Sequence, residues 1–333
     1  MRAWLAALAL SATLGAQTSV PRYDGPLDSA SRRVIHMEYR PVDLPLRWRS
    51  TGDLIISHVE SYSFADMGGA TCEGSGIYRI STEGQLTALA TAHPACDASD
   101  GESPAVDPDG RWVAYVVSTN VLGSRLVRLD LGTMRADTLL TPDANYFSSP
   151  AVSPDGRCIA IEAMRPGRGD ASFIFIMGSD GAGFHRLTRA LRGDRHDVAW
   201  SPDGTRLAFT QKDKIAVMDT SGRSMRTLAK GESPAWSPDG RWIAFQGPDR
   251  PVTSIALIHP DGSGKHDVFV NRTTSTLETG YGPMPEGEVW GPIVWSPDGS
   301  ALAFSRTYGN GTSIWRVDLG TGAVAPITAP GKP

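Results

Sequence analysis

The stretch Trp236-Ser-Pro-Asp-Gly240, followed by Arg-Trp-Ile-Ala-Phe245, recurs along the chain and decides the fold. Proline fixes φ at the first central position of a turn, aspartate suits the second, and glycine takes the positive φ that ends a bulged hairpin. Apolar residues on both sides of the tetrapeptide indicate two antiparallel strands joined by a short turn. Each copy therefore predicts a strand–turn–strand unit.

Five copies are clear and a sixth is degenerate. The clear copies occupy residues 107–110, 153–156, 201–204, 237–240 and 296–299. In the degenerate copy Trp48 and Gly52 keep the spacing of Trp236 and Gly240, although the Pro-Asp pair is absent. Successive copies lie 36 to 59 residues apart. Periods near this length are typical of propellers and solenoids.

Two further apolar runs follow each copy and predict a third and a fourth strand. The third strands are expected at 77–80, 126–129, 174–177, 215–218, 255–258 and 314–317, and the fourth at 87–89, 137–140, 186–188, 226–228, 267–270 and 325–328. An alanine recurs in the second strand and predicts close approach of a neighbouring sheet, at Ala114, Ala160, Ala208, Ala244 and Ala303. Six copies of four antiparallel strands predict an all-β fold, a six-bladed β-propeller.

The Ser-Pro-Asp-Gly repeat with Ala-Phe after it resembles the TolB-type, WD40-like propeller repeat, over about residues 46–328. The resemblance implies an envelope protein whose channel mouth receives a lipoprotein. Similar blades also occur in prolyl-oligopeptidase-like enzymes and in sugar-degrading lyases, so the resemblance does not fix the function. TolB proteins carry a whole α/β domain before the propeller. Only about thirty residues are available for it here, so we do not expect TolB itself.

Three segments are expected in the chain. Residues 1–16 resemble a secretory signal peptide, with Arg2 before a short apolar run and Ala16 at the cut. Residues 17–45 form an N-terminal extension, whose strand-like run at 34–39 is a candidate for an extra strand that closes the ring. The propeller occupies residues 46–333. These segments predict a periplasmic or secreted monomer with no transmembrane segment after signal cleavage.

The net charge of -4 and the pI near 6.0 give no electrostatic reason to expect a nucleic-acid partner. Cys72 and Cys96 are a disulfide candidate, because both fall in long excursions of the first blade in an exported protein. Such a bond would contribute about 3 kcal/mol on the chain-entropy account. Cys158 is expected to be a buried core thiol.

Almost all variation in loop length lies in two kinds of connection, from second to third strand and from fourth strand to the next blade. In a propeller these connections share one face, here called the long-loop face, which comprises residues 58–76, 91–103, 118–124, 165–172, 190–197, 247–254, 271–290 and 307–311. The remaining turns are uniformly short and form the opposite, short-turn face. Loops on a rigid scaffold commonly carry function, so the long-loop face is the expected binding face.

The binding residues expected around the channel mouth of this face are His58, Glu60, His93, Asp100, Glu102, His196, Asp197, Glu232, Tyr281 and Trp290. Histidine is a common zinc ligand, but these three histidines come from different blades and form no close-spaced ligand motif. We therefore expect no metal and no cofactor. Tyr281 and Trp290 either form an apolar lip for a partner or pack on their own blade. Both alternatives stay open.

The sequence contains no Gly-x-Ser-x-Gly nucleophile elbow and no second domain to hold the other members of a triad, so we expect no catalytic residues. The expected function is that of an exported, non-catalytic binding or scaffolding propeller that engages an envelope protein or lipoprotein on the long-loop face. One alternative is a small-molecule or sugar-binding propeller, acting as a metal-assisted lyase or hydrolase at the channel mouth. Another is a subunit of an envelope complex with no pocket of its own.

Overall fold

A computed structural model describes residues 42–49, 52–64, 70–81, 85–91, 98–119, 123–141, 146–164, 171–188, 191–192, 197–247, 253–271, 276–279, 282–285, 287–308 and 311–328. The predicted signal peptide and the run at 34–39 lie outside these residues. The secondary structure in the described ranges consists of strands and turns. None of their residues forms a helix of the length and apolarity needed to cross a membrane.

Five antiparallel sheets contain four strands each, in the order of the chain. They are β1 (Val42–Trp48), β2 (Leu54–Phe64), β3 (Ala70–Ile80) and β4 (Leu86–Thr91); β5 (Ala98–Val106), β6 (Trp112–Thr119), β7 (Gly123–Asp130) and β8 (Ala136–Leu140); β14 (Val198–Trp200), β15 (Arg206–Gln211), β16 (Lys214–Asp219) and β17 (Arg226–Lys230); β18 (Glu232–Trp236), β19 (Ile243–Gln246), β20 (Ser254–Ile258) and β21 (His266–Val270); and β24 (Val289–Trp295), β25 (Ala301–Tyr308), β26 (Gly311–Asp318) and β27 (Val324–Pro326).

The sheet of the third repeat copy has five strands, β9 (Tyr146–Val152), β10 (Cys158–Met164), β11 (Ala171–Gly178), β12 (His185–Arg186) and β13 (Leu191–Arg192). Both β12 and β13 pair with β11, through Phe175↔Arg186 and Ser172↔Leu191. The position of a fourth strand is therefore divided between two short pieces. A hairpin of β22 (Thr276–Thr279) and β23 (Gly282–Pro285) completes the described strands.

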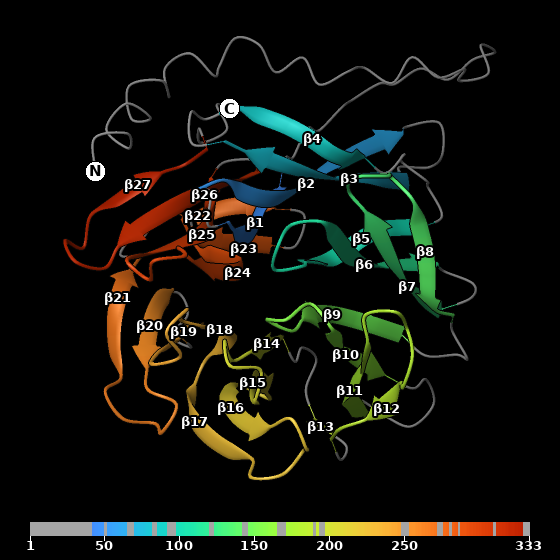
Figure 1. The fold of residues 1–333 in the computed structure, drawn as a ribbon. Helices are drawn as coiled ribbons and strands as arrows, with labels where there is room; N and C mark the ends of the chain where they lie inside the picture. The colour runs from blue at the N-terminus through green and yellow to red at the C-terminus, as the bar shows by residue number, and fades with distance from the viewer. Residues whose placement is uncertain are drawn as a thin grey trace.

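The structure confirms an all-β propeller with antiparallel four-stranded blades. It shows five such blades in the described ranges, so the prediction of six four-stranded blades is wrong for residues 146–192, where β13 is added. The sheets are arranged radially, with the first strand of each nearest the centre and the fourth at the periphery (Figure 1). β1 begins at Val42, so the first blade includes residues that the sequence analysis assigned to the N-terminal extension.

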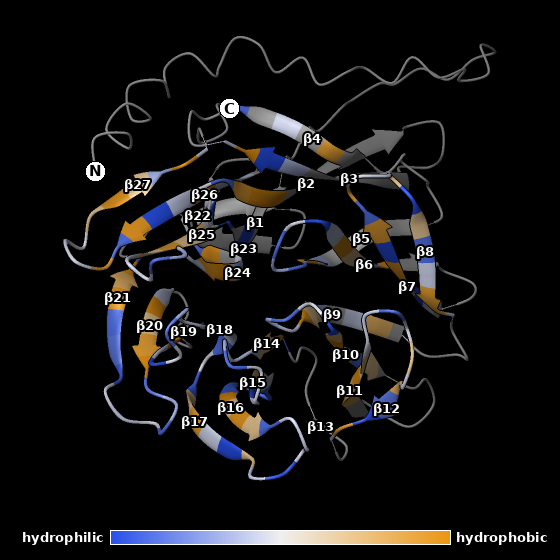
Figure 2. Cartoon of the chain, in the orientation of Figure 1, coloured by the Kyte–Doolittle hydropathy of each residue, from blue (hydrophilic) through white to orange (hydrophobic). Residues whose placement is uncertain are grey.

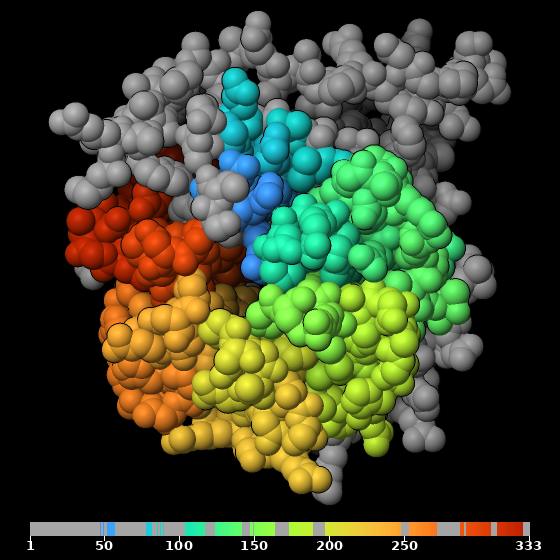
Figure 3. All heavy atoms as spheres, viewed as in Figure 1, coloured from blue at the N-terminus to red at the C-terminus, as the bar shows by residue number. Residues whose placement is uncertain are grey.

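The hydrophobic core is divided among the junctions between neighbouring sheets. The recurring alanines of the second strands lie there and are fully buried, as the sequence predicted. One cluster joins Leu54 and Ile56 of the first blade to Ala301, Ala303 and Ile314 of the last. In Figure 3 the blue first blade accordingly lies beside the red last blade. Figure 2 shows β20 mostly orange and the turn that follows it mostly blue. The first and last blades thus close the ring by side-chain packing.

A buried serine organises four of the Ser-Pro-Asp-Gly turns. Its hydroxyl donates to the aspartate two residues later at 2.5–2.7 Å and accepts the backbone N–H five residues later at 2.9 Å, in the turns that begin at Ser153, Ser201, Ser237 and Ser296. The serine hydroxyl is the main reason why the pKa of each turn aspartate is lowered, in the case of Asp298 to about 2. One hydroxyl therefore fixes both arms of the hairpin.

The second copy of the turn replaces the serine with Asp107, which is fully buried. Its Oδ1 accepts the backbone N–H of Trp112 at 3.0 Å and also that of Arg111. Asp109, which lacks a serine partner, pairs with the Arg111 guanidinium at 2.8 Å. A carboxylate can thus replace the hydroxyl as acceptor, while an arginine takes over the role of donor.

Two sequence-based expectations need correction. The predicted long loop at 58–76 is mostly strand, because β2 and β3 pair continuously from Leu54↔Ile80 to Phe64↔Ala70. Cys158 is a free thiol that is half-buried at the edge of the cluster between the β9–β13 and β14–β17 sheets, and this partial burial raises its pKa. Cys72 lies in β3, and Cys96 is outside the described residues, so the disulfide stays a prediction.

We predict that Ser237→Ala lowers the free energy of unfolding by about 1–3 kcal/mol, because the partly buried backbone N–H of Trp242 loses its acceptor. Ser221→Ala is the matched control, since the Ser221 hydroxyl makes the same kind of contact to Asp219 at an exposed position. Urea denaturation monitored by tryptophan fluorescence measures both variants. Equal losses would contradict the role given to the buried hydroxyl.

Candidate functional site

The first strand of most sheets changes its register partway along its length. β-Bulges occur in β1, β5, β9, β18 and β24, and each bulge has a proline within or beside it, namely Pro45, Pro104, Pro150, Pro234 and Pro292. These strands have a free edge toward the centre of the ring. Proline donates no hydrogen bond and is accepted at such edges and bulges. The bulges therefore protect the open edges and reorient the residues at the channel mouth.

A polar contact joins two neighbouring blades at this mouth. Ser233, in the bulge of β18, has a positive φ of 53°. Its hydroxyl donates to Asp197 Oδ2 at 3.0 Å, and its backbone N–H donates to Thr210 Oγ1 at 3.2 Å. Asp197 and Thr210 belong to the β14–β17 blade, so the bulge of one blade is held by the side chains of the previous one.

The same kind of contact continues around the ring. Gln246 Nε2 of β19 donates to the carbonyl oxygen of Gly291 in the bulge of β24 at 2.5 Å. In the β9–β13 sheet, the Ser148 hydroxyl donates to Oε2 of the buried Glu162 at 2.9 Å. Trp200 and Trp295 each donate their indole N–H to the preceding blade, to the carbonyl oxygens of Ala151 and Ala235 at 3.0 Å. The inner wall is therefore held together by hydrogen bonds within and between blades.

Glu232 differs from these residues because it is exposed, while Asp197 is half-buried and already accepts a hydrogen bond. Glu232 is the first residue of β18 and pairs with Gln246 in the sheet register. The Gln246 side chain is directed to Gly291 of the next blade. The backbone at Glu232 is thus held by the sheet pairing with Gln246 and by the contacts of the neighbouring Ser233, while the Glu232 carboxylate is exposed to solvent.

The structure places several other predicted site residues in strands instead of loops. His58 and Glu60 lie in β2, where His58 is the register partner of Asp43. Asp100 and Glu102 lie in β5. Trp290 lies in β24 opposite Ser305. These residues are distributed over three blades, as expected for a mouth built from many strands, while His93, His196 and Tyr281 lie outside the described residues.

Within the described ranges, no group of three histidine, cysteine, aspartate or glutamate side chains is close enough to hold a metal ion. Sequence reasoning missed Thr210 and Gln246, because neither stands before a first strand. It also treated 271–290 as an irregular loop, although β22 and β23 form a hairpin there. The proline directly before Ala105-Val106, Ala151-Val152 and Ala235-Trp236 was a usable signal for three of the bulges.

Sequence reasoning also missed two hollows on the short-turn face. One, of about 630 Å³, lies between the β14–β17 and β18–β21 blades, and the other, of about 400 Å³, between the β5–β8 blade and the β9–β13 sheet. Both are lined by arginines that stand beside the short turns. The face that the sequence analysis set aside as uniform therefore has concave sites of its own.

We predict that Gly231→Ala lowers the free energy of unfolding by about 2–4 kcal/mol, because two penalties add. Gly231 has a φ of 147°, and a Cβ there would overlap the Phe245 ring and lie 2.5 Å from the Gln246 carbonyl oxygen. Gly183→Ala is the control, because Gly183 also has a positive φ, of 70°, but its Cβ would meet no atom within 4 Å. Thermal unfolding of both variants measures the difference. A Gly231→Ala variant no less stable than Gly183→Ala would contradict this packing.

Comparison with known proteins agrees with this architecture. Residues 77–284 match the TolB beta propeller domain family, which is more than half of the 333-residue chain. No curated protein sequence matches the chain. Among solved structures, the putative TolB from Agrobacterium tumefaciens is similar, with a TM-score of 0.55 and 22% identity over 73% of this chain and 84% of that one.

Two enzymes have similar folds. An oligogalacturonate lyase solved in complex with manganese superposes with a TM-score of 0.55 and 13% identity, covering 87% of this chain and 84% of the lyase. A puromycin-hydrolysing peptidase from Mycobacterium tuberculosis superposes with a TM-score of 0.56 and 16% identity, covering 89% of this chain but only 54% of the peptidase. At these identities the likeness extends to the fold alone. With its matching repeats and its radial sheets, the chain belongs to the TolB β-propeller domain family.

Proposed function

We propose that the protein is an exported, non-catalytic binding or scaffolding propeller that engages a protein partner of the cell envelope on its long-loop face. The observation that carries the proposal is the exposed Glu232 beside the Asp197–Ser233 contact. These residues place one solvated carboxylate on a wall whose backbone is already fixed. A fixed wall reduces the entropy lost on binding, which favours recognition of a partner.

The family supports an envelope location. The match with the similar TolB structure extends over 84% of the length of that structure. TolB-like propellers suggest an envelope protein or lipoprotein as the partner, and the periplasm as the compartment. The signal peptide at 1–16 and the extension at 17–45 are part of the same proposal. Within it the chain acts as a monomer without a cofactor.

The ring itself is part of the proposal. We infer that the β9–β13 sheet serves as the sixth blade, with β12 and β13 together taking the position of its outer strand. Its core cluster packs against blades on both sides, as those of the four-stranded blades do. Six blades leave a central channel whose mouth is the binding site.

A second candidate function is binding of a sugar or another small molecule, with a metal-assisted lyase or hydrolase reaction at the mouth. It is favoured by the structural similarity to the oligogalacturonate lyase that contains manganese. His58, His93 and His196 are the candidate ligands. Metal analysis of the purified protein separates the two functions, because the partner-binding function requires no bound metal.

We predict that Glu232→Arg reduces capture of the partner by at least about tenfold. In a complementary interface Glu232 faces a positive group of the partner, and the substitution places two positive charges opposite each other. The measurement is affinity capture, after crosslinking, from the envelope of the cells that make the protein. Asp267→Arg is the matched control, since Asp267 is an exposed carboxylate on the outer strand β21.

The proposal requires one defined protein that is captured by the parent chain and by Asp267→Arg but lost with Glu232→Arg, while all three melt alike. Equal capture by the two variants would place the contact away from the mouth. An empty capture by the parent, together with a stoichiometric metal, would favour the second candidate.

A further inference from the structure

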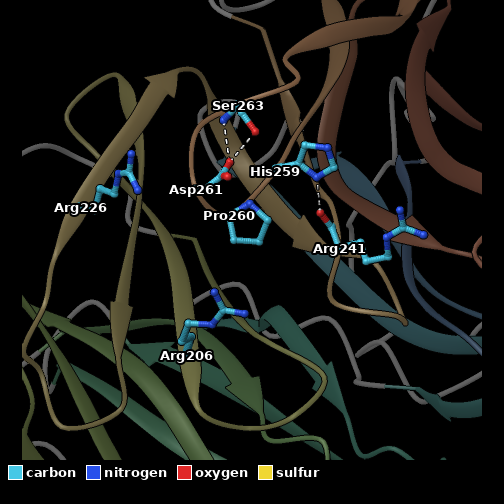
Figure 4. Close-up of a pocket in the computed structure, with 7 residues that line it drawn as sticks. All are labelled: Arg206, Arg226, Arg241, His259, Pro260, Asp261 and Ser263. Carbon is cyan, nitrogen blue, oxygen red and sulfur yellow. Dashed lines mark hydrogen bonds between the residues drawn. The ribbon is translucent and has the colours of Figure 1, made fainter.

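The larger hollow of the short-turn face lies at the junction of two blades. Arg206 and Arg226 come from the β14–β17 blade, and Arg241, His259 and Ser263 from the turns of the β18–β21 blade. In Figure 4 Arg206 and Arg226 lie on one side of Pro260, and His259 and Arg241 on the other. The hollow has a volume of about 630 Å³ and is wide open to solvent.

The positive charges of this hollow are not neutralised by ion pairs. In the part of the chain that the structure describes, no carboxylate comes within ion-pair distance of the guanidinium of Arg206, Arg226 or Arg241, although such pairs occur elsewhere, as between Arg111 and Asp109. Arg206 is positioned by stacking, with its guanidinium carbon 4.8 Å from the centre of the Trp236 ring. Arg226 and Arg241 are exposed and can reorient toward a ligand.

One carboxylate lines the hollow, but its best hydrogen-bonding atom is already used. Asp261 Oδ1 accepts the backbone N–H of Ser263 at 2.8 Å and the Ser263 hydroxyl at 2.6 Å (Figure 4). These two bonds are the main reason why the pKa of Asp261 is lowered, the charge of Arg226 adds to the effect, and the bonds hold the carboxylate in its own turn. Three arginines against one aspartate leave an excess of positive charge in the lining.

The imidazole of His259 is fixed in one orientation. Its Nδ1 is 2.8 Å from the Arg241 carbonyl oxygen, which only accepts, so Nδ1 carries the proton. The ring stacks on Trp242 with the ring centres 3.7 Å apart. Because Nδ1 and one ring face are occupied, Nε2 is the polar atom left to contact a ligand.

The second hollow has a similar lining, but two of its arginines have partners within the protein. It also contains three arginines, Arg111, Arg128 and Arg157, at a blade junction. There Arg111 pairs with Asp107 and Asp109, and Arg128 donates to the Ser179 carbonyl oxygen at 3.3 Å. Asp130 and Asp155 line it as well. Around the larger hollow Asp203, Asp239 and Asp261 lie near Arg206, Arg241 and Arg226. Serine hydroxyls are the main reason why the pKa of each of these carboxyls is lowered, and the charges of the arginines add to the effect. Within the described residues none of the three arginines forms an ion pair, so their guanidinium N–H groups are available to an external anion.

We propose that the larger hollow binds a small organic polyanion whose carboxylate or phosphate groups are held by Arg206, Arg226 and Arg241. The planar fork of arginine matches both groups with paired hydrogen bonds. His259 Nε2 supplies a further polar contact at the rim. The site lies on the face opposite the channel mouth, and it does not depend on the partner proposed there.

Isothermal titration of the full chain with citrate, and separately with inorganic phosphate, tests the site, each against sodium chloride of equal ionic strength. At least one of the two anions is expected to bind saturably at about 10 mM or below. Arg226→Gln and Arg241→Gln are each expected to weaken this binding about tenfold, because each removes a charged donor. Arg223→Gln is the matched control, since Arg223 is exposed in the turn before β17 but does not line the hollow.

Binding of citrate alone identifies a carboxylate ligand, and binding of phosphate identifies a phosphate ligand. Arg226→Lys, which keeps the charge and loses the fork, is expected to bind more weakly than the parent and serves if a glutamine variant unfolds. The proposal is overturned if neither anion binds, or if Arg223→Gln weakens binding as much as Arg226→Gln does. Unchanged binding in both glutamine variants overturns it as well.

Discussion

The structure depends on a buried serine hydroxyl that joins the first and second strands of a blade at the Ser-Pro-Asp-Gly turn. In the turn that begins at Ser237 it accepts a backbone N–H and donates to Asp239, so both arms of the hairpin are held at one point. The strand that leaves this turn contains Ile243, Ala244 and Phe245, all fully buried. Because each blade buries both of its faces, no blade is complete without its two neighbours.

Closure of the ring follows from this dependence. The first blade would otherwise expose Leu54 and Ile56, and the last would expose Ile314. Their mutual packing removes both apolar surfaces from water. What stays open is the set of first-strand edges around the centre, where bulges and prolines replace regular pairing. The channel mouth is therefore polar and rigid for reasons of fold, which suits it to recognition.

The two faces differ in chemistry. At the mouth, Asp197 and Ser233 satisfy each other, and Glu232 is exposed. On the short-turn face, arginines next to the repeated turns gather between blades, and beside the smaller hollow Arg111 forms ion pairs with Asp107 and Asp109. A repeat sequence thus produces similar junctions, and a few substitutions such as Asp107 for serine change what a junction can bind.

Much of this fold could be predicted from the sequence, because Pro, Asp and Gly have local conformational preferences that do not depend on the rest of the chain. The turns followed from these preferences, and the strand order and the buried alanines followed from the apolar runs and the small residues that recur around each turn. The divided outer strand of β12 and β13 could not be predicted, since only the pairing with β11 defines it. For the mouth, the sequence indicated Asp197 and Glu232 from their position before a strand. Thr210 and Gln246 required the structure, because their contacts cross from one blade to the next.

We propose that a protein partner binds at the long-loop mouth and not at the short-turn face. Hydrogen–deuterium exchange of the chain alone and in complex with its captured partner tests this claim most directly. We predict slower exchange in the complex at the bulges of β18 and β24, around Ser233 and Gly291, with no change at the turn of residues 237–240. Protection confined to the short turns would contradict it.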